Sequence, residues 1–446
     1  MHLPPGLPTL PNGWDYALLE ELVDQVRGIS YGVVQPGNPR ADGVPILRVN
    51  NVREGRVITD DVLRIAPEIE RKHVRTRLQG GEVLLTLVGT LGEVAVAAPA
   101  LKGWNTARAV GVIPVRSDVG AGWVSLALRS PLSRHFATVW ATTTVQATLN
   151  LRDVARLPIP MPPPWEREAV YRIFGALDDK IELNRCMNRT LEAMAAALFK
   201  AWFVDFEPTG DQTSIDGVFT TIESPSAQRL SVWRDATAGE PPPGWRFGQM
   251  SDVAQLGRGT MDPAQFPTEP FDYYSLPAFD LGKVAAVEQG SSIKSNKTTL
   301  SEDCVLVSKL NPHIPRVWLV RRRRGVRSVS STEFLPLTPM AGTNLEFLYC
   351  LATSAGFARS LKERATGTTG SHQRVPPDSL LAIPVAIPPR PVMQGFGTLM
   401  GPLLAKIAQN RSEAQTLATL RDTLLPKLLS GEIRVRDAES LLGAAV

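Results

Sequence analysis

The sequence predicts an α+β protein in which two tandem sheet-rich domains are separated by two long helices packed as an antiparallel coiled coil. Three observations predict this fold: a stretch that occurs twice, a seven-residue pattern within it, and short β-branched runs outside it. A shift of 226 residues without a gap places Pro158 on Pro384 and Lys180 on Lys406. Because similarity at a fixed period indicates a repeated architecture, the chain is predicted to be a tandem duplication.

Both copies of the repeat contain apolar residues at alternating steps of three and four, which is typical of helices that pack side by side as a coiled coil. A proline tract precedes each helix, and proline is tolerated in a helix's first turn. Asn184 and Asn410 occupy matching polar positions, and a buried amide fixes the register because it tolerates few alternative pairings. The predicted seam consists of Phe174, Leu177, Ile181, Asn184, Leu191, Leu198, Met400, Leu403, Ile407, Asn410, Leu417 and Leu424.

The two remaining regions open in the same way, with Pro-x-Gly-Trp ending at Trp14 and at Trp245. Short helices are expected next, over 18–26 and 250–256. Matched strands follow, 82–86 with 304–308 and 94–98 with 317–320, as β-branched runs broken by Gly, Pro and Asn. Such runs indicate a mixed, sheet-rich domain.

The stretch between the first helix and the second sheet-rich region is rich in Thr, Ser, Asp and Gly and has no sustained periodicity, so it is expected to be a loop. The predicted organisation is a first domain (1–157), a first spacer helix (158–206), a connector loop (207–240), a second domain (241–383), a second spacer helix (384–436) and a tail (437–446).

The amino-acid composition narrows the kind of protein that this chain can be. The chain is 43% hydrophobic and 21% charged, which is an ordinary globular balance. No apolar run has the length needed to cross a bilayer, and prolines interrupt the N-terminal residues where a signal peptide would lie, so a cytoplasmic protein without a membrane partner is expected. The three cysteines are widely spaced, which indicates reduced thiols. The net charge of +4 is compatible with a polyanionic partner.

The sequence contains none of the common catalytic motifs. The sequence has no phosphate-binding G-x-x-x-x-G-K-[ST] loop, no G-x-S-x-G elbow, no H-E-x-x-H and no paired cysteine ligands. The five histidines are scattered singly, and an isolated histidine is more often a surface or core residue than a metal ligand. Neither a catalytic nor a metal site is predicted, and the balance favours a binding protein over an enzyme.

The combination of these features resembles the specificity subunit of type I restriction-modification enzymes. The likeness rests on the repeated order of basic domain, proline tract and heptad helix with Lys-Ile-x-x-Asn-Arg, and on the run Leu-Asn-Leu-Arg-Asp-Val-Ala-Arg-Leu-Pro over 149–158. The helix end over 202–206 and the Pro-x-Gly-Trp openings agree with it. The second half departs from the pattern, because 375–380 lacks the Leu-Asn-Leu.

This resemblance covers nearly the whole chain and implies a division of labour. Each globular half would be a target-recognition domain that reads one part of a split sequence in double-stranded DNA. The helices would set the spacing and dock two methyltransferase subunits and, through them, restriction/translocase subunits. No cofactor is expected on this chain, since S-adenosylmethionine, ATP and Mg belong to the partner subunits in this family.

Candidate DNA-binding residues are those whose side chains grip phosphates or read base edges, in loops at matching places of both halves. For each one alone, a solvated surface role is the alternative. The run Arg321 to Arg324 is either a hairpin tip on the phosphate backbone or a solvated turn. The candidates are Arg27, Ser30, Tyr31, Arg48, Asn50, Asn51, Arg53, Thr90, Gln146, Arg152, Arg258, Lys294, Asn296, Lys297, Lys309, Asn311, Arg321, Arg322, Arg323, Arg324, Ser371, His372, Gln373 and Arg374.

Two other classes of function stay open at this point. One is a coiled-coil scaffold that joins proteins and ignores nucleic acid, which would bind no duplex even with methyltransferase subunits present. The other is a stand-alone DNA-modifying enzyme with a dispersed site, which would cut or methylate DNA without partners.

Overall fold

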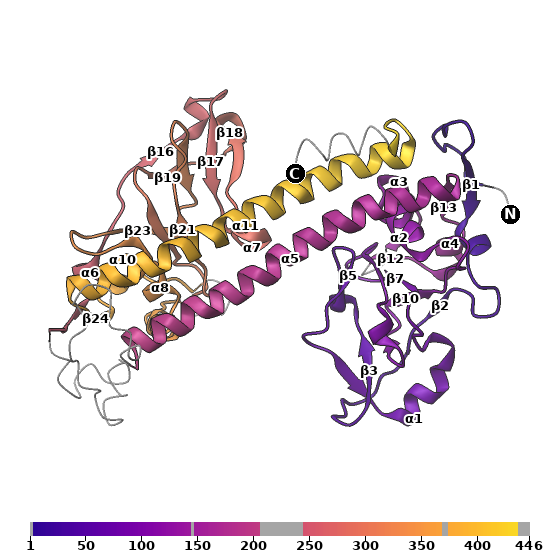
Figure 1. Ribbon diagram of the computed structural model, residues 1–446, viewed down its shortest axis with the longest axis horizontal. Helices are drawn as coiled ribbons and strands as arrows, with labels where there is room; N and C mark the ends of the chain where they lie inside the picture. The colour runs from indigo at the N-terminus through magenta and orange to yellow at the C-terminus, as the bar shows by residue number, and fades with distance from the viewer. Residues whose placement is uncertain (1–2, 144–146, 206–243, 368–372, 436–446) are drawn as a thin grey trace. The chain divides into compact units, whose positions relative to one another are not determined.

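The chain forms two compact units, each of which is described by itself. Unit 1 comprises residues 1–179 and 417–446, and unit 2 comprises residues 180–416. Each unit contains one sheet-rich region and a segment of each of two long helices, α5 (Pro164–Phe203) and α11 (Arg390–Ser430) (Figure 1). The predicted mixture of sheet and helix is confirmed. The computed structural model describes residues 3–143, 147–205, 244–367 and 373–435.

The sheet-rich region of unit 1 is built around β7 (Val83–Thr86), whose four residues are all buried. It lies in an antiparallel sheet of order β2-β10-β7-β8, and helix α2 (Ala121–Arg129) packs against it. A second sheet has the order β6-β3-β9. The other elements are β2 (Ser30–Tyr31), β3 (Val44–Leu47), β4 (Val52–Arg53), β5 (Arg56–Val57), β6 (Leu63–Ile65), α1 (Pro67–Glu70), β8 (Val94–Val96), β9 (Asn105–Thr106), β10 (Val110–Ile113), α3 (Pro131–Trp140), β11 (Thr142–Thr143), β12 (Ala147–Thr148) and α4 (Leu151–Ala155).

Unit 2 has the corresponding buried strand in β20 (Cys304–Ser308), within a sheet of order β15-β23-β20-β21. A second, five-stranded sheet has the order β16-β19-β22-β17-β18, and its strands are interspersed in the sequence with those of the first. The elements are α6 (Met250–Val253), β15 (Ala254–Leu256), β16 (Thr260–Met261), β17 (Pro270–Tyr274), α7 (Leu276–Gly282), β18 (Ala286–Gln289), β19 (Lys297–Leu300), β21 (Val317–Val320), β22 (Arg327–Ser330), β23 (Phe334–Pro339), α8 (Leu345–Thr353), α9 (Ala355–Glu363) and α10 (Pro377–Leu381).

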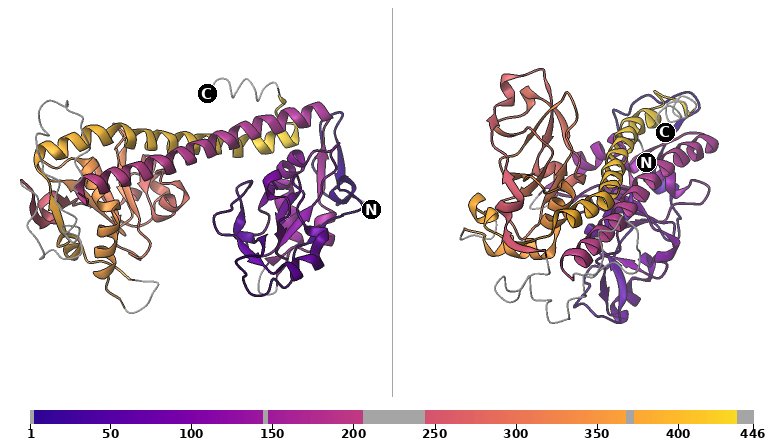
Figure 2. Two further views of the ribbon diagram at one scale, coloured as in Figure 1. Left: turned by 60° about the horizontal axis from the view of Figure 1, so that its bottom comes forward. Right: turned by 60° about the vertical axis from the view of Figure 1, so that its left-hand side comes forward.

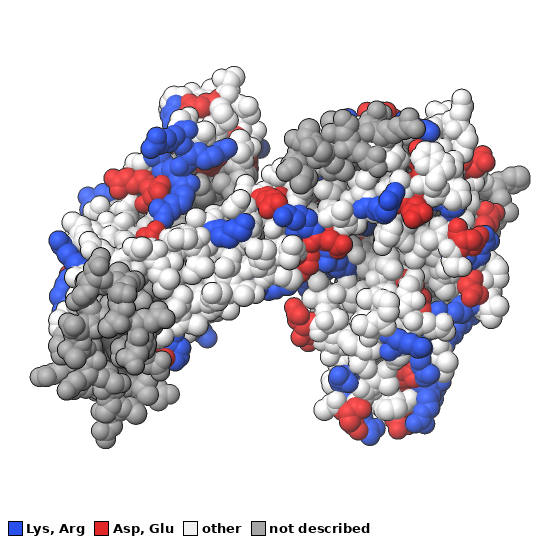
Figure 3. Space-filling model, in the orientation of Figure 1, with Lys and Arg blue, Asp and Glu red and all other residues white. Residues whose placement is uncertain are grey.

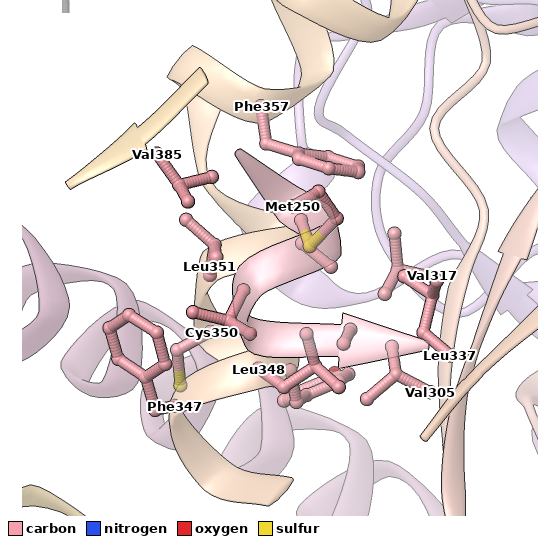
Figure 4. Packing of buried hydrophobic residues seen from close by; sticks show 14 of the residues in the cluster. Met250, Val305, Val317, Leu337, Phe347, Leu348, Cys350, Leu351, Phe357 and Val385 are labelled. Atoms are coloured by element: carbon pink, nitrogen blue, oxygen red, sulfur yellow. The ribbon is translucent and has the colours of Figure 1, made fainter. Parts of the chain in front are cut away.

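The core of unit 2 joins this sheet to the helices. Val305 of β20, Leu337 of β23 and Leu348 of α8 pack together with Met250 of α6 and Phe357 of α9 (Figure 4). The same cluster includes Phe199, Phe203, Phe396 and Met400 from α5 and α11, so the helix segments share their core with the sheet-rich region. Burial of apolar area is the main source of stability here.

The duplication is visible in the sheets of the two units. The strand order β2-β10-β7-β8 recurs as β15-β23-β20-β21, and in each unit one neighbouring sheet contains a parallel pair, β3 with β9 and β17 with β22. The strands predicted at 82–86, 94–98, 304–308 and 317–320 are confirmed as β7, β8, β20 and β21. The sequence repeat therefore corresponds to a repeated fold.

Both spacer helices begin later than predicted. Residues Pro158–Met161 form strand β13, which pairs antiparallel with β1 (Asp15–Leu18), and Pro384–Ile387 form β24, which pairs with β14 (Arg246–Gln249). The proline tract is responsible, because proline lacks a backbone donor and pushes the residue before it into the extended region. The starts expected at 158 and 384 are thus wrong by six residues, and the tract belongs to the sheet-rich region.

The short helices expected near each tryptophan are also shorter than predicted. Residues Leu19–Leu22 form only a 3₁₀ turn, after which Val23 bridges Val115. In unit 2, α6 ends at Val253 because Ala254–Leu256 pairs with β23. Tertiary strand pairing overrides local helical periodicity in both places.

Within each unit the α5 and α11 segments lie side by side and run in opposite directions (Figure 1, Figure 2). In unit 2, Asn184 Nδ2 donates to Glu413 Oε2 (3.1 Å) and Asn410 Nδ2 donates to Asn188 Oδ1 (3.0 Å). In unit 1, Arg421 Nη1 donates to Asp178 Oδ1 (2.8 Å). The two seam amides are therefore each engaged across the helix pair, although they do not bond to each other.

The predicted seam residues are buried or half-buried. Leu191, Leu198 and Leu403 are partly buried, and the others are buried: Phe174, Leu177, Ile181, Asn184, Met400, Ile407, Asn410, Leu417 and Leu424. An apolar stripe that faces another element is what keeps an amphipathic helix in place.

The three cysteines are free thiols in different environments, which gives a simple test of the fold. Cys186 is exposed, whereas burial raises the pKa of Cys304 and of Cys350 to about 12. Because the thiolate is the reactive form, we expect a thiol reagent at neutral pH to modify Cys186 alone in the native protein. All three should react in denaturant. Modification of Cys304 in the native state, located by peptide mass spectrometry, would contradict the placement of β20.

Candidate nucleic-acid interface

In unit 1, three segments meet at the end of the buried strand β7. Leu87 N–H donates to Ala109 O (2.8 Å), Leu149 N–H donates to Leu87 O (3.0 Å), and Val88 bridges Thr148. The hydroxyl of Tyr31 accepts from Leu151 N–H (3.2 Å). We call residues 87–92, 107–109 and 147–152 the loop junction of unit 1.

The loop junction of unit 1 brings together three of the predicted DNA-binding residues. Thr90 and Arg152 are exposed there, and Tyr31 is a half-buried residue of β2 whose hydroxyl contacts the start of α4. A hydroxyl, a guanidinium and an aromatic ring on adjacent loops are suited to grip phosphates and to contact base edges. Ser30 lies beside Tyr31 in β2, while Gln146 lies outside the described residues.

Unit 2 has the same junction at the end of β20. Lys309 N–H donates to Glu333 O (2.9 Å), Val375 N–H donates to Lys309 O (2.9 Å), and Leu310 bridges Arg374. These contacts repeat those of Leu87, Ala109, Leu149, Val88 and Thr148, one for one. We call residues 309–314, 331–333 and 373–375 the loop junction of unit 2.

This second junction also gathers predicted residues. Asn311 adopts a left-handed backbone (φ 50°) and its N–H donates to Gln373 O (2.8 Å). Arg374 forms a two-contact pair with Glu333, through Nε (3.1 Å) and Nη2 (3.0 Å). Arg258 follows β15, the strand that takes the place of β2 in the sheet order. Ser371 and His372 lie outside the described residues.

Arg27, in contrast, lies at the opposite end of β7. Its Nη1 contacts Glu82 Oε1 (2.7 Å) and its Nη2 donates to Arg77 O (3.1 Å), and Glu82 directly precedes the strand. Burial acts to raise the pKa of Glu82, but hydrogen bonds from Arg27 and from backbone amides outweigh it and hold the pKa below its usual range. Arg27 therefore stabilises the fold by pairing with the buried carboxylate of Glu82.

The group at 48–53 forms a separate loop against residues 58–61. Asn51 is buried and its Nδ2 donates to Ile58 O and to Asp61 O, both at 2.9 Å. Arg48 pairs with Asp61 (2.8 Å), and Arg53 Nε donates to Asn50 O (2.9 Å). Asn51 therefore organises a turn, while Asn50 and Arg53 are exposed.

The run Arg321 to Arg324 is not a hairpin tip, which corrects that expectation, because β21 and β22 belong to different sheets. Arg321 pairs with Asp303 and Glu346, Arg322 N–H donates to Asp303 Oδ1 (2.9 Å), and Arg323 pairs with Asp272. Arg324 is exposed. Basic side chains have acidic ones beside them on the visible face (Figure 3). Two of the four guanidinium groups in this run, those of Arg321 and Arg323, are therefore paired with carboxylates of the protein.

Lys297 is also engaged internally. It is buried, and its ammonium donates to the carbonyl oxygens of Lys294 and Ser295 and to Ser295 Oγ (2.9 Å). Burial lowers the pKa of Lys297. Lys294 and Asn296 remain exposed on the loop that this lysine holds together.

One residue of the loop junction of unit 1 was missed by the sequence analysis. Arg108 is exposed, its N–H donates to Val33 O (2.8 Å), and its guanidinium lies 5.8 Å from the centre of the Tyr31 ring. The matching position of unit 2 is Thr332. The only signal in the sequence was a single basic residue, which has no basic counterpart at the matching position of the second half.

Within the described ranges, no group of three or more His, Cys, Asp or Glu side chains is placed to hold a metal ion. No helix of those ranges combines the length and hydrophobicity needed to span a lipid bilayer.

Comparisons with known proteins agree on one family. The chain is 24% identical over 369 residues to the specificity subunit of the type I restriction enzyme MjaIX of Methanocaldococcus jannaschii, covering 80% of this chain and 78% of that one. It is 28% identical over 199 residues to the specificity subunit of EcoBI of Escherichia coli, covering 43% of this chain and 42% of the relative. No family model matches the chain.

The fold is similar to that of a solved protein, the type I restriction-modification system S subunit of M. genitalium. The TM-score is 0.54 at 16% identity, and the match covers 94% of this chain and 98% of the other. At this identity the likeness concerns the fold alone.

Proposed function

We propose that this chain, a member of the family of type I restriction enzyme specificity subunits, supplies the DNA sequence specificity of such an enzyme and performs no chemistry itself. The observation that carries the proposal is the recurrence, in both units, of one sheet order with one loop junction at the end of its buried strand. Two equivalent binding surfaces on one chain suit a target with two separate parts.

Each sheet-rich region is then a target-recognition domain that reads one half of a bipartite site in double-stranded DNA through its loop junction. Arg108, Thr90 and Arg152 contact DNA in the first half, and Lys309 and Asn311 do so in the second. Ser30, Asn50, Arg53, Arg258, Lys294, Asn296 and Arg324 remain candidates for phosphate contacts because they are exposed or half-buried.

The helices α5 and α11 form an antiparallel coiled coil that sets the spacing between the two half-sites and docks two methyltransferase subunits. Their interhelix hydrogen bonds and buried seam support this role. On the outer face of α5, the large apolar side chains of Leu183, Met187 and Met194 are exposed at helical spacing, and such a stripe marks a protein interface.

The remaining chemistry belongs to partners in this proposal. S-adenosylmethionine binds to the methyltransferase subunits, and ATP and Mg bind to the restriction/translocase subunits that join through them. The complex acts on DNA in the cytoplasm.

An exchange of one recognition domain tests the proposal. The complete complex is expressed in a host and its target is read by methylome sequencing, before and after residues 1–157 are replaced by those of a relative. We expect methylation to depend on this chain and one half of the recognised sequence to change. A change of both halves would contradict the assignment of one domain to one half, and methylation without sequence dependence would refute the proposal.

A further inference from the structure

Unit 1 contains a cluster of charges where three parts of the fold meet. Asp178 of α5 accepts from Arg421 Nη1 of α11 at Oδ1 (2.8 Å) and from Arg129 Nη1, at the end of α2, at Oδ2 (3.1 Å). Arg56 of β5 adds a fourth group, since its Nη2 donates to Asp178 O (2.5 Å) and contacts Asp179 Oδ1 (3.4 Å). One carboxylate thus joins both helices to the recognition domain.

Unit 2 contains a second cluster that is also centred on a carboxylate of α5. Glu192 of α5 accepts from Arg411 of α11, and Lys283 Nζ, directly after α7, lies 3.9 Å from Glu192 Oε1. Here too a carboxylate of α5 lies between an arginine of α11 and a cation of the recognition domain. The contact to the domain is longer and Glu192 is more exposed than Asp178.

The repeat does not preserve the carboxylates at the centres of these clusters. The shift of 226 residues places Leu404 on Asp178 and Ala418 on Glu192. Both carboxylates lie on α5 and both arginines lie on α11. The two clusters are therefore not related to each other by the repeat.

Burying charged side chains at these places adds little to the stability of the fold. The side chains of Asp178, Arg421 and Arg129 are only 11–19% exposed, and Arg421 occupies a heptad position where its neighbours in the seam are leucines. A well-packed apolar group is commonly as stabilising as a buried ion pair, whereas the ion pair demands fixed directions from every partner. What the ion pair adds is a fixed orientation of the groups that it joins.

We propose that Asp178 and Glu192 are positioning residues that hold each recognition domain at one angle to the α5–α11 pair, with Asp178 exerting the tighter control. The inference rests on the proposed function, in which the helices set the distance between half-sites. A domain that rocks on its helix would let its loop junction reach half-sites at more than one distance. The clusters thus narrow the range of spacings that the complex accepts.

The test uses the full complex with methyltransferase subunits and duplexes carrying the target found by methylome sequencing, at its natural spacing and one base pair longer or shorter. For Asp178→Asn, we expect the preference for the natural spacing, measured as a ratio of Kd values, to fall by about fivefold or more. Glu192→Gln should lower the same ratio less. A purely structural role would lower the melting temperature and leave the ratio unchanged.

The matched control is Glu182→Gln, which removes the same charge from the same helix. The ion pair of Glu182 with Arg189 (3.1 Å) lies within α5. This variant should retain the wild-type ratio. If Asp178→Asn does not assemble, Arg129→Gln decides, because it leaves the pair of Asp178 with Arg421 in place and should reproduce the loss of preference.

The outcomes separate the two proposals. A wild-type complex that binds no specific sequence, or binds all spacings equally, refutes the proposed function. A wild-type complex with a spacing preference that Asp178→Asn and Arg129→Gln both retain refutes the positioning role alone.

Discussion

Phe203→Ala is expected to lower the free energy of unfolding of unit 2 by about 3–5 kcal/mol, because it empties the centre of an aromatic cluster. Phe203 is 1% exposed, and its ring centre lies 4.7 Å from that of Phe396, 5.1 Å from Phe347 and 5.8 Å from Trp245. The ring joins α5, α11, α8 and the opening of the second recognition domain. Urea unfolding followed by tryptophan fluorescence measures the loss.

The control for this substitution is Leu183→Ala on the same helix. Leu183 is 53% exposed, so its truncation should change the free energy of unfolding by less than about 0.5 kcal/mol. The same variant should weaken binding of a methyltransferase subunit if the outer face of α5 is its docking surface. Equal destabilisation by both substitutions would mean that the cluster around Phe203 is not packed as described.

Arg27→Ala is expected to lower the free energy of unfolding by about 3 kcal/mol at neutral pH, because it leaves a buried carboxylate without its cation. Glu82 is 2% exposed and retains only backbone donors once the guanidinium is gone, among them Gln79 N–H (2.8 Å). Chemical denaturation of the two proteins at neutral pH gives the difference.

The effect of Arg27→Ala should depend on pH in a defined direction. The pKa of Glu82 is lowered in the folded protein, so its contribution to stability is present above the unfolded pKa of about 4.3 and is lost as pH falls through the folded value. The variant and the wild type should therefore converge in acid. Arg40→Ala is the control, since its pair with Asp42 is exposed and should be worth little at any pH. A constant difference from pH 7 to pH 3 would contradict the role of Arg27.

The sequence predicted the parts of this fold that depend on local pattern. The seven-residue spacing predicted both long helices and which of their side chains are buried, and the β-branched runs predicted β7 and β20. These predictions are confirmed because the spacing of apolar residues along the chain reflects which side of a helix or strand is buried. The helix starts were misplaced, since the proline tract pairs with a strand more than 130 residues away.

The site was harder to predict because charge in a sequence does not reveal its partner. Arg323 pairs with Asp272, 51 residues earlier, and Arg27 pairs with Glu82, 55 residues later. Both arginines appeared free to bind phosphates until the fold was known. Arg108 and Asp178 were overlooked for the opposite reason: neither belongs to a basic run or to a matched pair, and each becomes notable only through the groups around it.

The pairing of β1 with β13, and of β14 with β24, has a consequence for how such proteins diversify. The strand by which the chain enters each recognition domain lies next to the strand by which it leaves. Foreign coding sequence inserted between those two points would bring the chain back to the same place, where the helix begins. Recombination between genes could then deliver a new specificity in one event, provided that the incoming domain supplies a cation for the helix carboxylate that orients it.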